Sequence, residues 1–132
     1  MLKNAVIAAG IFGFVGVAMG AFGAHAMKDS LVRSGLLSTY QTASLYCLVH
    51  ALALLGVGVL DIVSPSSKTA IRLRWATRCF VFGIGIFSGS LWALAIFEIK
   101  WLGAITPVGG VILLAGWCSV LLAGISRHSA PE

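Results

Sequence analysis

Four long apolar runs, separated by short polar stretches, make up most of this 132-residue chain. They cover approximately residues 5–26, 43–63, 76–97 and 102–125. Each run is close to the ~20 residues that an α-helix needs to cross ~30 Å of hydrocarbon. Strands of a membrane barrel would be ~10 residues long with alternating polar positions, a pattern that the sequence lacks. The sequence therefore predicts an all-α integral membrane protein, a four-helix bundle that forms a single membrane domain over residues 1–132.

The composition excludes the other broad classes of protein. Hydrophobic residues account for 59% of the chain and charged residues for only 10%, whereas a soluble domain carries about 25% charged residues. Disordered chains combine low hydrophobicity with high charge, so disorder is excluded as well. The formal net charge is +5, but the basic residues flank apolar spans, which favours membrane orientation over nucleic-acid binding.

The first apolar run has some features of a cleaved signal peptide. Lys3 precedes it, and the small-residue sequence Ala24-His25-Ala26 ends it. The apolar region of a signal peptide is ~7–15 residues long, and this run is longer. We therefore expect the run to be retained as the first span.

The connections between the runs are short. Val32, Leu36, Leu37 and Tyr40 recur at helical spacing and predict a helix at the membrane interface over residues 29–40. Pro65 lies in a turn after the second run, because proline cannot continue a helix. Residues 97–102 leave room only for a tight turn, so the last two helices should form an antiparallel hairpin.

The basic residues predict an orientation in the membrane. Four spans place both termini on one side, together with six lysines and arginines, and leave three on the other side. Because lysine and arginine in short loops are enriched on the cytoplasmic side, we expect both termini in the cytoplasm. The six residues are Lys3, Lys68, Arg72, Arg74, Arg78 and Arg127, and the three are Lys28, Arg33 and Lys100.

Small residues recur along the predicted helices at spacings that suit close helix packing. In lipid, helices associate largely through van der Waals contact, which small residues promote by letting two backbones approach. These contacts could form inside one bundle or between copies of the chain, and the pattern does not distinguish the two. The residues are Gly16, Gly20 and Ala24, then Gly85 and Gly89, and then Gly109, Gly110 and Gly116.

Uncharged polar residues within the spans are the candidate functional residues. His50 lies within the second span, and Tyr46 precedes it by four residues on the same helix face. Two interpretations of His50 stay open, a structural hydrogen bond between helices and a functional proton or ligand site. We expect a single polar pocket that opens toward the outer face and is formed by His25, Tyr46, His50, Ser88, Ser90 and Thr106.

The sequence contains no recognisable catalytic or cofactor-binding motif. Asp61 lies near the end of a span, Asp29 and Glu98 lie in turns, and no buried carboxylate pair is seen, which argues against a proton-driven carrier. Phosphate-binding loops, nucleophile elbows and metalloprotease motifs are missing. Cys47, Cys79 and Cys118 lie in apolar runs without metal-ligand spacing. We expect neither catalytic residues nor a cofactor or metal, and hence not an enzyme.

Four sequence blocks together resemble a known family. They are GAFGAHAM at 20–27, YCLVHALALLGVG at 46–58, FSGSLWALA at 87–95 and LGAITPVGGVILLAGW at 102–117. In this order they resemble the domain of unknown function 423 family, the YgdD-like small inner-membrane proteins, to which the eukaryotic transmembrane protein 256 is similar. The resemblance implies a multi-pass protein of the bacterial inner (plasma) membrane and supplies no catalytic residue or ligand.

Two kinds of function fit these observations. The first is a structural or accessory partner of a larger membrane complex, or a homo-oligomer, as the small size and glycine-rich faces suggest. The alternative is a small transporter or channel, in which the predicted polar pocket would line part of a path. A path must cross both halves of the bilayer, and the inner half has few polar groups beyond Asp61.

Overall fold

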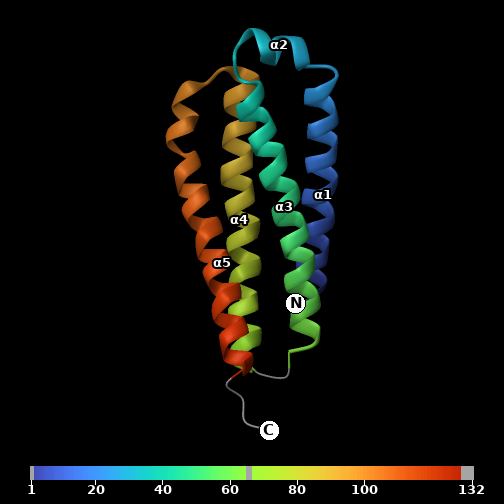
Figure 1. Ribbon diagram of the computed structural model, residues 1–132, viewed down its shortest axis with the longest axis vertical. Helices are drawn as coiled ribbons and strands as arrows, with labels where there is room; N and C mark the ends of the chain where they lie inside the picture. Colours follow the sequence, from blue (N-terminus) through green and yellow to red (C-terminus); the bar gives the residue numbers. More distant parts are fainter. Residues whose placement is uncertain (1, 65–66, 129–132) are drawn as a thin grey trace.

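The computed structural model describes residues 2–64 and 67–128 and is helical over most of that length (Figure 1). The elements are α1 (Leu2–Ala24), α2 (Lys28–Arg33), α3 (Leu37–Ile62), α4 (Ser67–Phe97), the 3-10 helix η1 (Lys100–Ala104) and α5 (Thr106–His128). Four segments of the described residues are long and apolar enough to cross a membrane. Three of them lie in the helices α1, α3 and α4, and the fourth runs from η1 into α5. Over the described residues, the prediction of an all-α fold with four helices long enough to be membrane spans is confirmed.

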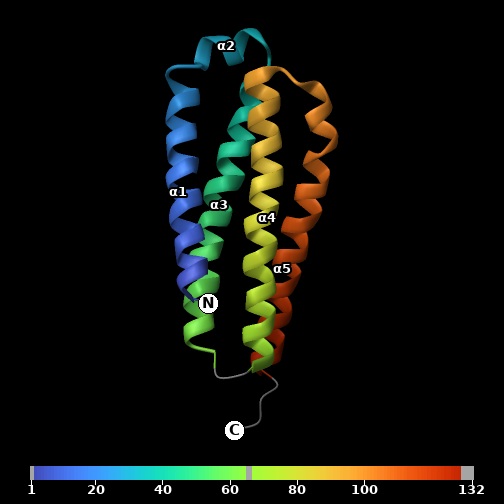
Figure 2. The same cartoon turned by 180° about the vertical axis from the view of Figure 1, so that it is seen from behind.

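The helices form two antiparallel hairpins, α1 with α3 and α4 with α5 (Figures 1 and 2). Helices α3 and α4 pack against each other in the centre, whereas α1 lies against α3 and α5 lies against α4. Helix α2 and the start of α5 lie at one end of the bundle, and the start of α1 and the end of α5 lie at the other. The predicted antiparallel hairpin of the last two helices is confirmed. Its connection is longer than the predicted tight turn, because η1 lies between the two helices and α5 begins at Thr106 instead of residue 102.

Helix α4 begins much earlier than hydropathy suggested. We predicted a span from residue 76, but the helix starts at Ser67 and includes four basic residues in its first turns. Lysine and arginine are good helix formers, so a helix can continue out of the hydrocarbon without a break. The lower hydropathy before residue 76 therefore marks where α4 leaves the hydrocarbon, and it does not mark the end of the helix. The four residues are Lys68, Arg72, Arg74 and Arg78.

The predicted interfacial helix over residues 29–40 is not one helix. Helix α2 ends at Arg33, and Gly35 adopts a positive φ of 72°. The amide of Leu36 donates to Leu31 O at 3.0 Å and the amide of Gly35 donates to Val32 O at 3.1 Å. This is the Schellman pattern, which ends a helix where a glycine follows it. Residues 37–40 consequently belong to α3, and the glycine was the signal that helical periodicity overlooked.

Two side chains of α3 fasten α1 to it. The hydroxyl of Tyr40, a side chain only 1% exposed, donates to Met19 O at 2.7 Å. Its ring lies against Gly23, where a Cβ atom would collide with the ring. The thiol of Cys47 donates to Phe12 O at 3.3 Å, and all three cysteines are free thiols. Gly23, which the small-residue series did not include, therefore lies at a closer contact between α1 and α3 than Gly16 does.

The predicted small-residue series divides into packed and open positions. A Cβ atom on Gly16 would lie 2.8 Å from Leu48 Cδ2, and one on Gly116 would lie 2.6 Å from Phe80 Cε1. Gly109 packs on the backbone of α4, and Gly110 makes an ordinary contact with the Phe87 ring. Ala24 is exposed, and nothing lies within 4 Å of a Cβ atom built on Gly20, Gly85 or Gly89. Packing inside one chain thus accounts for only part of the series.

Candidate functional site

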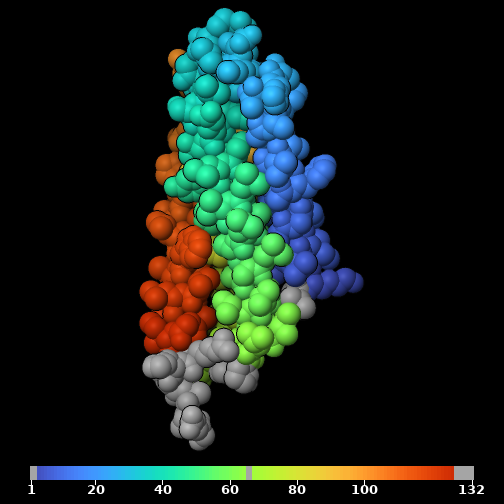
Figure 3. All heavy atoms as spheres, turned by 45° about the vertical axis from the view of Figure 1, so that its right-hand side comes forward, coloured from blue at the N-terminus to red at the C-terminus, as the bar shows by residue number. Residues whose placement is uncertain are grey.

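A lateral groove lies between α3, α4 and α5 and has a volume of about 550 Å³. Its rim includes Val111 and Leu114 on α5, each 65% exposed. In the space-filling view, α3 lies between α1 and α5 on this face of the molecule (Figure 3). The groove faces the side of the bundle, which is the bilayer in a membrane. It is lined by Tyr46, Val49, His50, Phe87, Pro107, Gly110, Val111, Leu113, Leu114 and Trp117.

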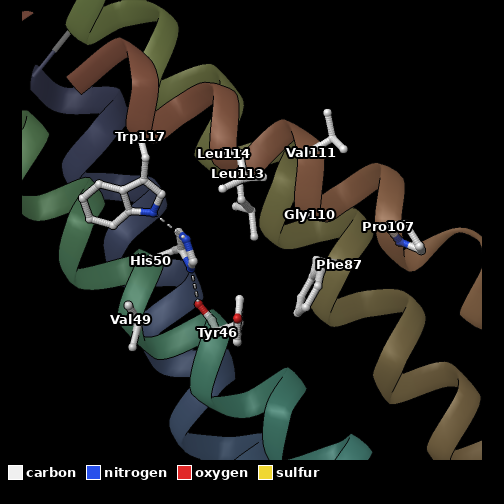
Figure 4. A pocket seen from close by; sticks show the side chains of 10 residues that line it. All are labelled: Tyr46, Val49, His50, Phe87, Pro107, Gly110, Val111, Leu113, Leu114 and Trp117. Atoms are coloured by element: carbon white, nitrogen blue, oxygen red, sulfur yellow. Dashed lines mark hydrogen bonds between the residues drawn. The ribbon is translucent and has the colours of Figure 1, made fainter. Parts of the chain in front are cut away.

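His50 lies at the back of the groove and links two helices (Figure 4). Its side chain is 4% exposed, Nδ1 lies 2.8 Å from Tyr46 O, and Nε2 lies 3.1 Å from Trp117 Nε1. A carbonyl oxygen only accepts and an indole N–H only donates. Nδ1 must therefore carry the proton and Nε2 must accept from Trp117, which assigns a neutral imidazole with both nitrogens engaged.

This bonding favours the structural interpretation of His50. A proton or a metal ion at Nε2 would have to displace the Trp117 hydrogen bond. The rings of His50, Phe80 and Trp117 also pack edge to face, with centroid separations of 5.2–6.0 Å. Within the described residues, no three His, Cys, Asp or Glu side chains are grouped to hold a metal. His50 therefore acts as a polar link from α3 to α5 within an aromatic cluster.

Tyr46 lines the same groove closer to its mouth. Its side chain is 40% exposed, and its ring stacks on Phe87 of α4 with centroids 4.5 Å apart. The Tyr46 hydroxyl has no hydrogen-bond partner in the described part of the chain. It is thus the polar side-chain group that the groove leaves available.

The other predicted pocket residues lie elsewhere. Ser90 Oγ and Thr106 Oγ1 are 2.8 Å apart and join α4 to the start of α5. Ser88 is 1% exposed and its hydroxyl has no partner within the described residues. His25 is exposed beyond the end of α1. Of the six residues expected to share one pocket, only Tyr46 and His50 line the groove. Residues of similar depth on a helix can point in different directions, because successive residues are rotated by about 100° around the helix axis.

Comparison with known sequences identifies the family. The family model described as a protein of unknown function, DUF423, matches residues 19–110. A UPF0382 membrane protein of Staphylococcus epidermidis is 38% identical over 122 residues, which cover 92% of this chain and 95% of the relative. The UPF0382 inner membrane protein YgdD of Escherichia coli K12 is also 38% identical over 122 residues, covering 91% of this chain and 88% of YgdD. The chain belongs to the DUF423 family.

Family membership confirms the resemblance seen in the four sequence blocks. The names of the relatives place them in the membrane, and that of YgdD in the inner membrane. Together with the four candidate spans, this makes the DUF423 protein described here an inner-membrane protein. No solved structure matches the chain.

Sequence reasoning missed two tryptophans that organise the interior of this DUF423 protein. Trp117 donates to His50, and Trp92 Nε1 donates to Ser44 Oγ at 3.2 Å, which joins α4 to α3. A buried indole N–H usually finds an acceptor, and both residues fall within predicted spans. The two tryptophans within predicted spans could therefore have predicted hydrogen bonds to polar residues on neighbouring spans. The choice of partner depended on how the helices are arranged.

Proposed function

We propose that this DUF423 protein is a non-catalytic accessory protein that binds a transmembrane helix of a partner in the groove between α3 and α5. The observation that carries the proposal is the direction of the groove, which opens sideways and has an apolar rim. Only a component of the bilayer can reach such an opening in a membrane protein. A partner helix is such a component.

The dimensions of the groove suit one face of a helix. Its α5 wall runs from Pro107 to Trp117, which is about 15 Å at a rise of 1.5 Å per residue. Gly110 lies in this wall beside the exposed side chains Val111 and Leu114. Small residues beside larger ones form the kind of surface on which transmembrane helices pack.

A second copy of the chain is one form that the partner can take. A Cβ atom built on Gly20 of α1 would meet no atom of the described residues within 4 Å, so α1 has an open small-residue surface. In the most hydrophobic part of α1 only 17% of the residues are buried inside the chain, compared with 44% in α3 and in α4. This open surface supports an assembly larger than one chain.

The geometry gives the alternative, a transporter or channel, less support. Such a protein needs polar groups through both halves of the bilayer. His50, Ser90 and Thr106 use their polar atoms to bond to other parts of the chain. The groove itself is mostly apolar and opens to the side.

A photoreactive residue in place of Leu114 should crosslink to a protein in native membranes, since Leu114 lies on the groove rim. Phe82 on α4 is the matched control, because it is 66% exposed but lies outside the groove. Val111→Trp, which fills the groove, should reduce the Leu114 adduct several-fold. Differently tagged copies of the chain will show whether the partner is a second copy. Equal protein adducts from both positions, or lipid adducts alone from Leu114, would contradict the proposal.

We further propose that both termini face the cytoplasm, on the six-against-three count of basic residues. Ser30 in α2 and Ser67 at the start of α4 are exposed at opposite ends of the bundle. A membrane-impermeant thiol reagent added to spheroplasts should label Ser30→Cys but should label Ser67→Cys only after lysis. The unsubstituted chain measures the background from its own cysteines. Labelling of Ser67→Cys before lysis would invert the orientation.

A further inference from the structure

The charged residues of α4 are confined to its first turns. After Arg78 the helix carries no further charged residue up to its end at Phe97. This uncharged part, residues 79–97, is about 29 Å long at 1.5 Å per residue, which matches the ~30 Å thickness of the hydrocarbon. Arg78 therefore lies at the hydrocarbon boundary. Arg74 lies about 6 Å farther out, among the lipid headgroups.

Arg74 and Arg78 share an exposed face of α4, because residues four apart lie above one another on a helix. Trp75 is adjacent and 56% exposed. Its ring centroid lies 5.4 Å from Cζ of Arg78, a cation–π contact. This contact restrains the Arg78 guanidinium while its N–H groups stay able to donate.

The charges of these two arginines are not neutralised by the described part of the chain. No carboxylate among the described residues forms an ion pair with either guanidinium. This includes Asp61, which lies at the same end of the bundle. Arg72 differs, because its Nη1 donates to Leu122 O at 2.6 Å and so bonds to α5. Arg74 and Arg78 are thus positioned to interact with a group beyond the described part of the chain.

We propose that Arg74, Trp75 and Arg78 form a binding site for the phosphate group of an anionic phospholipid. Guanidinium groups bind phosphate oxygens through paired, charge-assisted hydrogen bonds, and tryptophan favours the headgroup region. Basic residues beside a span attract anionic lipids. Toward the bilayer centre, the same side of α4 presents the exposed Phe82 and the open Gly85, an apolar surface along which an acyl chain can lie.

The test compares lipid retention by the purified chain in native mass spectrometry. Phosphatidylglycerol should bind at least several-fold more tightly than phosphatidylcholine, because each basic residue near an anionic surface contributes about a factor of five. The double variant Arg74→Gln/Arg78→Gln should lose about tenfold or more in phosphatidylglycerol affinity. Inorganic phosphate at millimolar concentration should not displace the lipid, since it lacks the acyl chains.

Lys28→Gln/Arg33→Gln is the matched control, because it removes the same charge from exposed positions at the other end of the bundle. Its phosphatidylglycerol affinity should change less than twofold. Equal losses in both double variants, equal binding of the two lipids, or displacement by inorganic phosphate would overturn the proposal. If the first double variant fails to fold, the single variants Arg74→Gln and Arg78→Gln replace it. Each should then weaken binding about fivefold.

Discussion

Gly109→Ala should destabilise the protein by about 1–3 kcal/mol or more, the cost of overpacking a well-packed contact. A Cβ atom at Gly109 would lie 2.5 Å from Phe87 N and 2.8 Å from Phe87 Cα. Both are backbone atoms of α4, so no side-chain rotation relieves the collision and the two helices must separate. Unfolding of the purified protein in mixed micelles, followed by circular dichroism against the mole fraction of denaturing detergent, measures the loss.

The adjacent glycine provides the control for this experiment. A Cβ atom at Gly110 would lie 3.7 Å from the Phe87 ring, an ordinary van der Waals distance. Gly110→Ala should therefore change the free energy of unfolding by less than ~0.5 kcal/mol. If the two variants were equally stable, α4 and α5 would not approach as closely as the structure shows.

His50→Ala should cost about 2–5 kcal/mol of stability, the range for large-to-small substitutions in a core. The change removes a ring that packs against both Phe80 and Trp117, and it leaves the Trp117 indole N–H without its acceptor. In a double-mutant cycle of His50→Ala with Trp117→Phe, the coupling energy should be about 0.6 kcal/mol, with ~1.7 kcal/mol as the upper end for hydrogen bonds between membrane helices. The same unfolding assay measures all three variants.

Val49→Ala serves as the control for His50, because Val49 is next in sequence and lines the same groove but is 45% exposed. Val49→Ala should lower the free energy of unfolding by much less than His50→Ala does. A His50→Ala protein as stable as the unsubstituted chain, or a coupling energy of zero, would contradict the role of His50 as a link between α3 and α5.

The pairing of polar residues could be predicted only in part from the sequence. Tyr46 and His50 lie four residues apart on one helix, so their shared face followed from helical spacing alone. Similar depth in the membrane predicts that Ser88 and Ser90 join them, but depth along a helix does not specify direction around it. The structure turns Ser90 toward Thr106 and leaves the groove to Phe87.

The sequence by itself determined the four membrane spans, the end of the bundle at which each charge lies, and the family. These properties depend on hydropathy and chain order, which act along each helix independently of its neighbours. The tertiary structure decided which glycines are needed for packing, since Gly109 and Gly85 look alike in sequence but only Gly109 meets another backbone. It also decided the partner of His50 and the position of the groove. Both depend on the rotation of each helix about its own axis, which packing between helices sets.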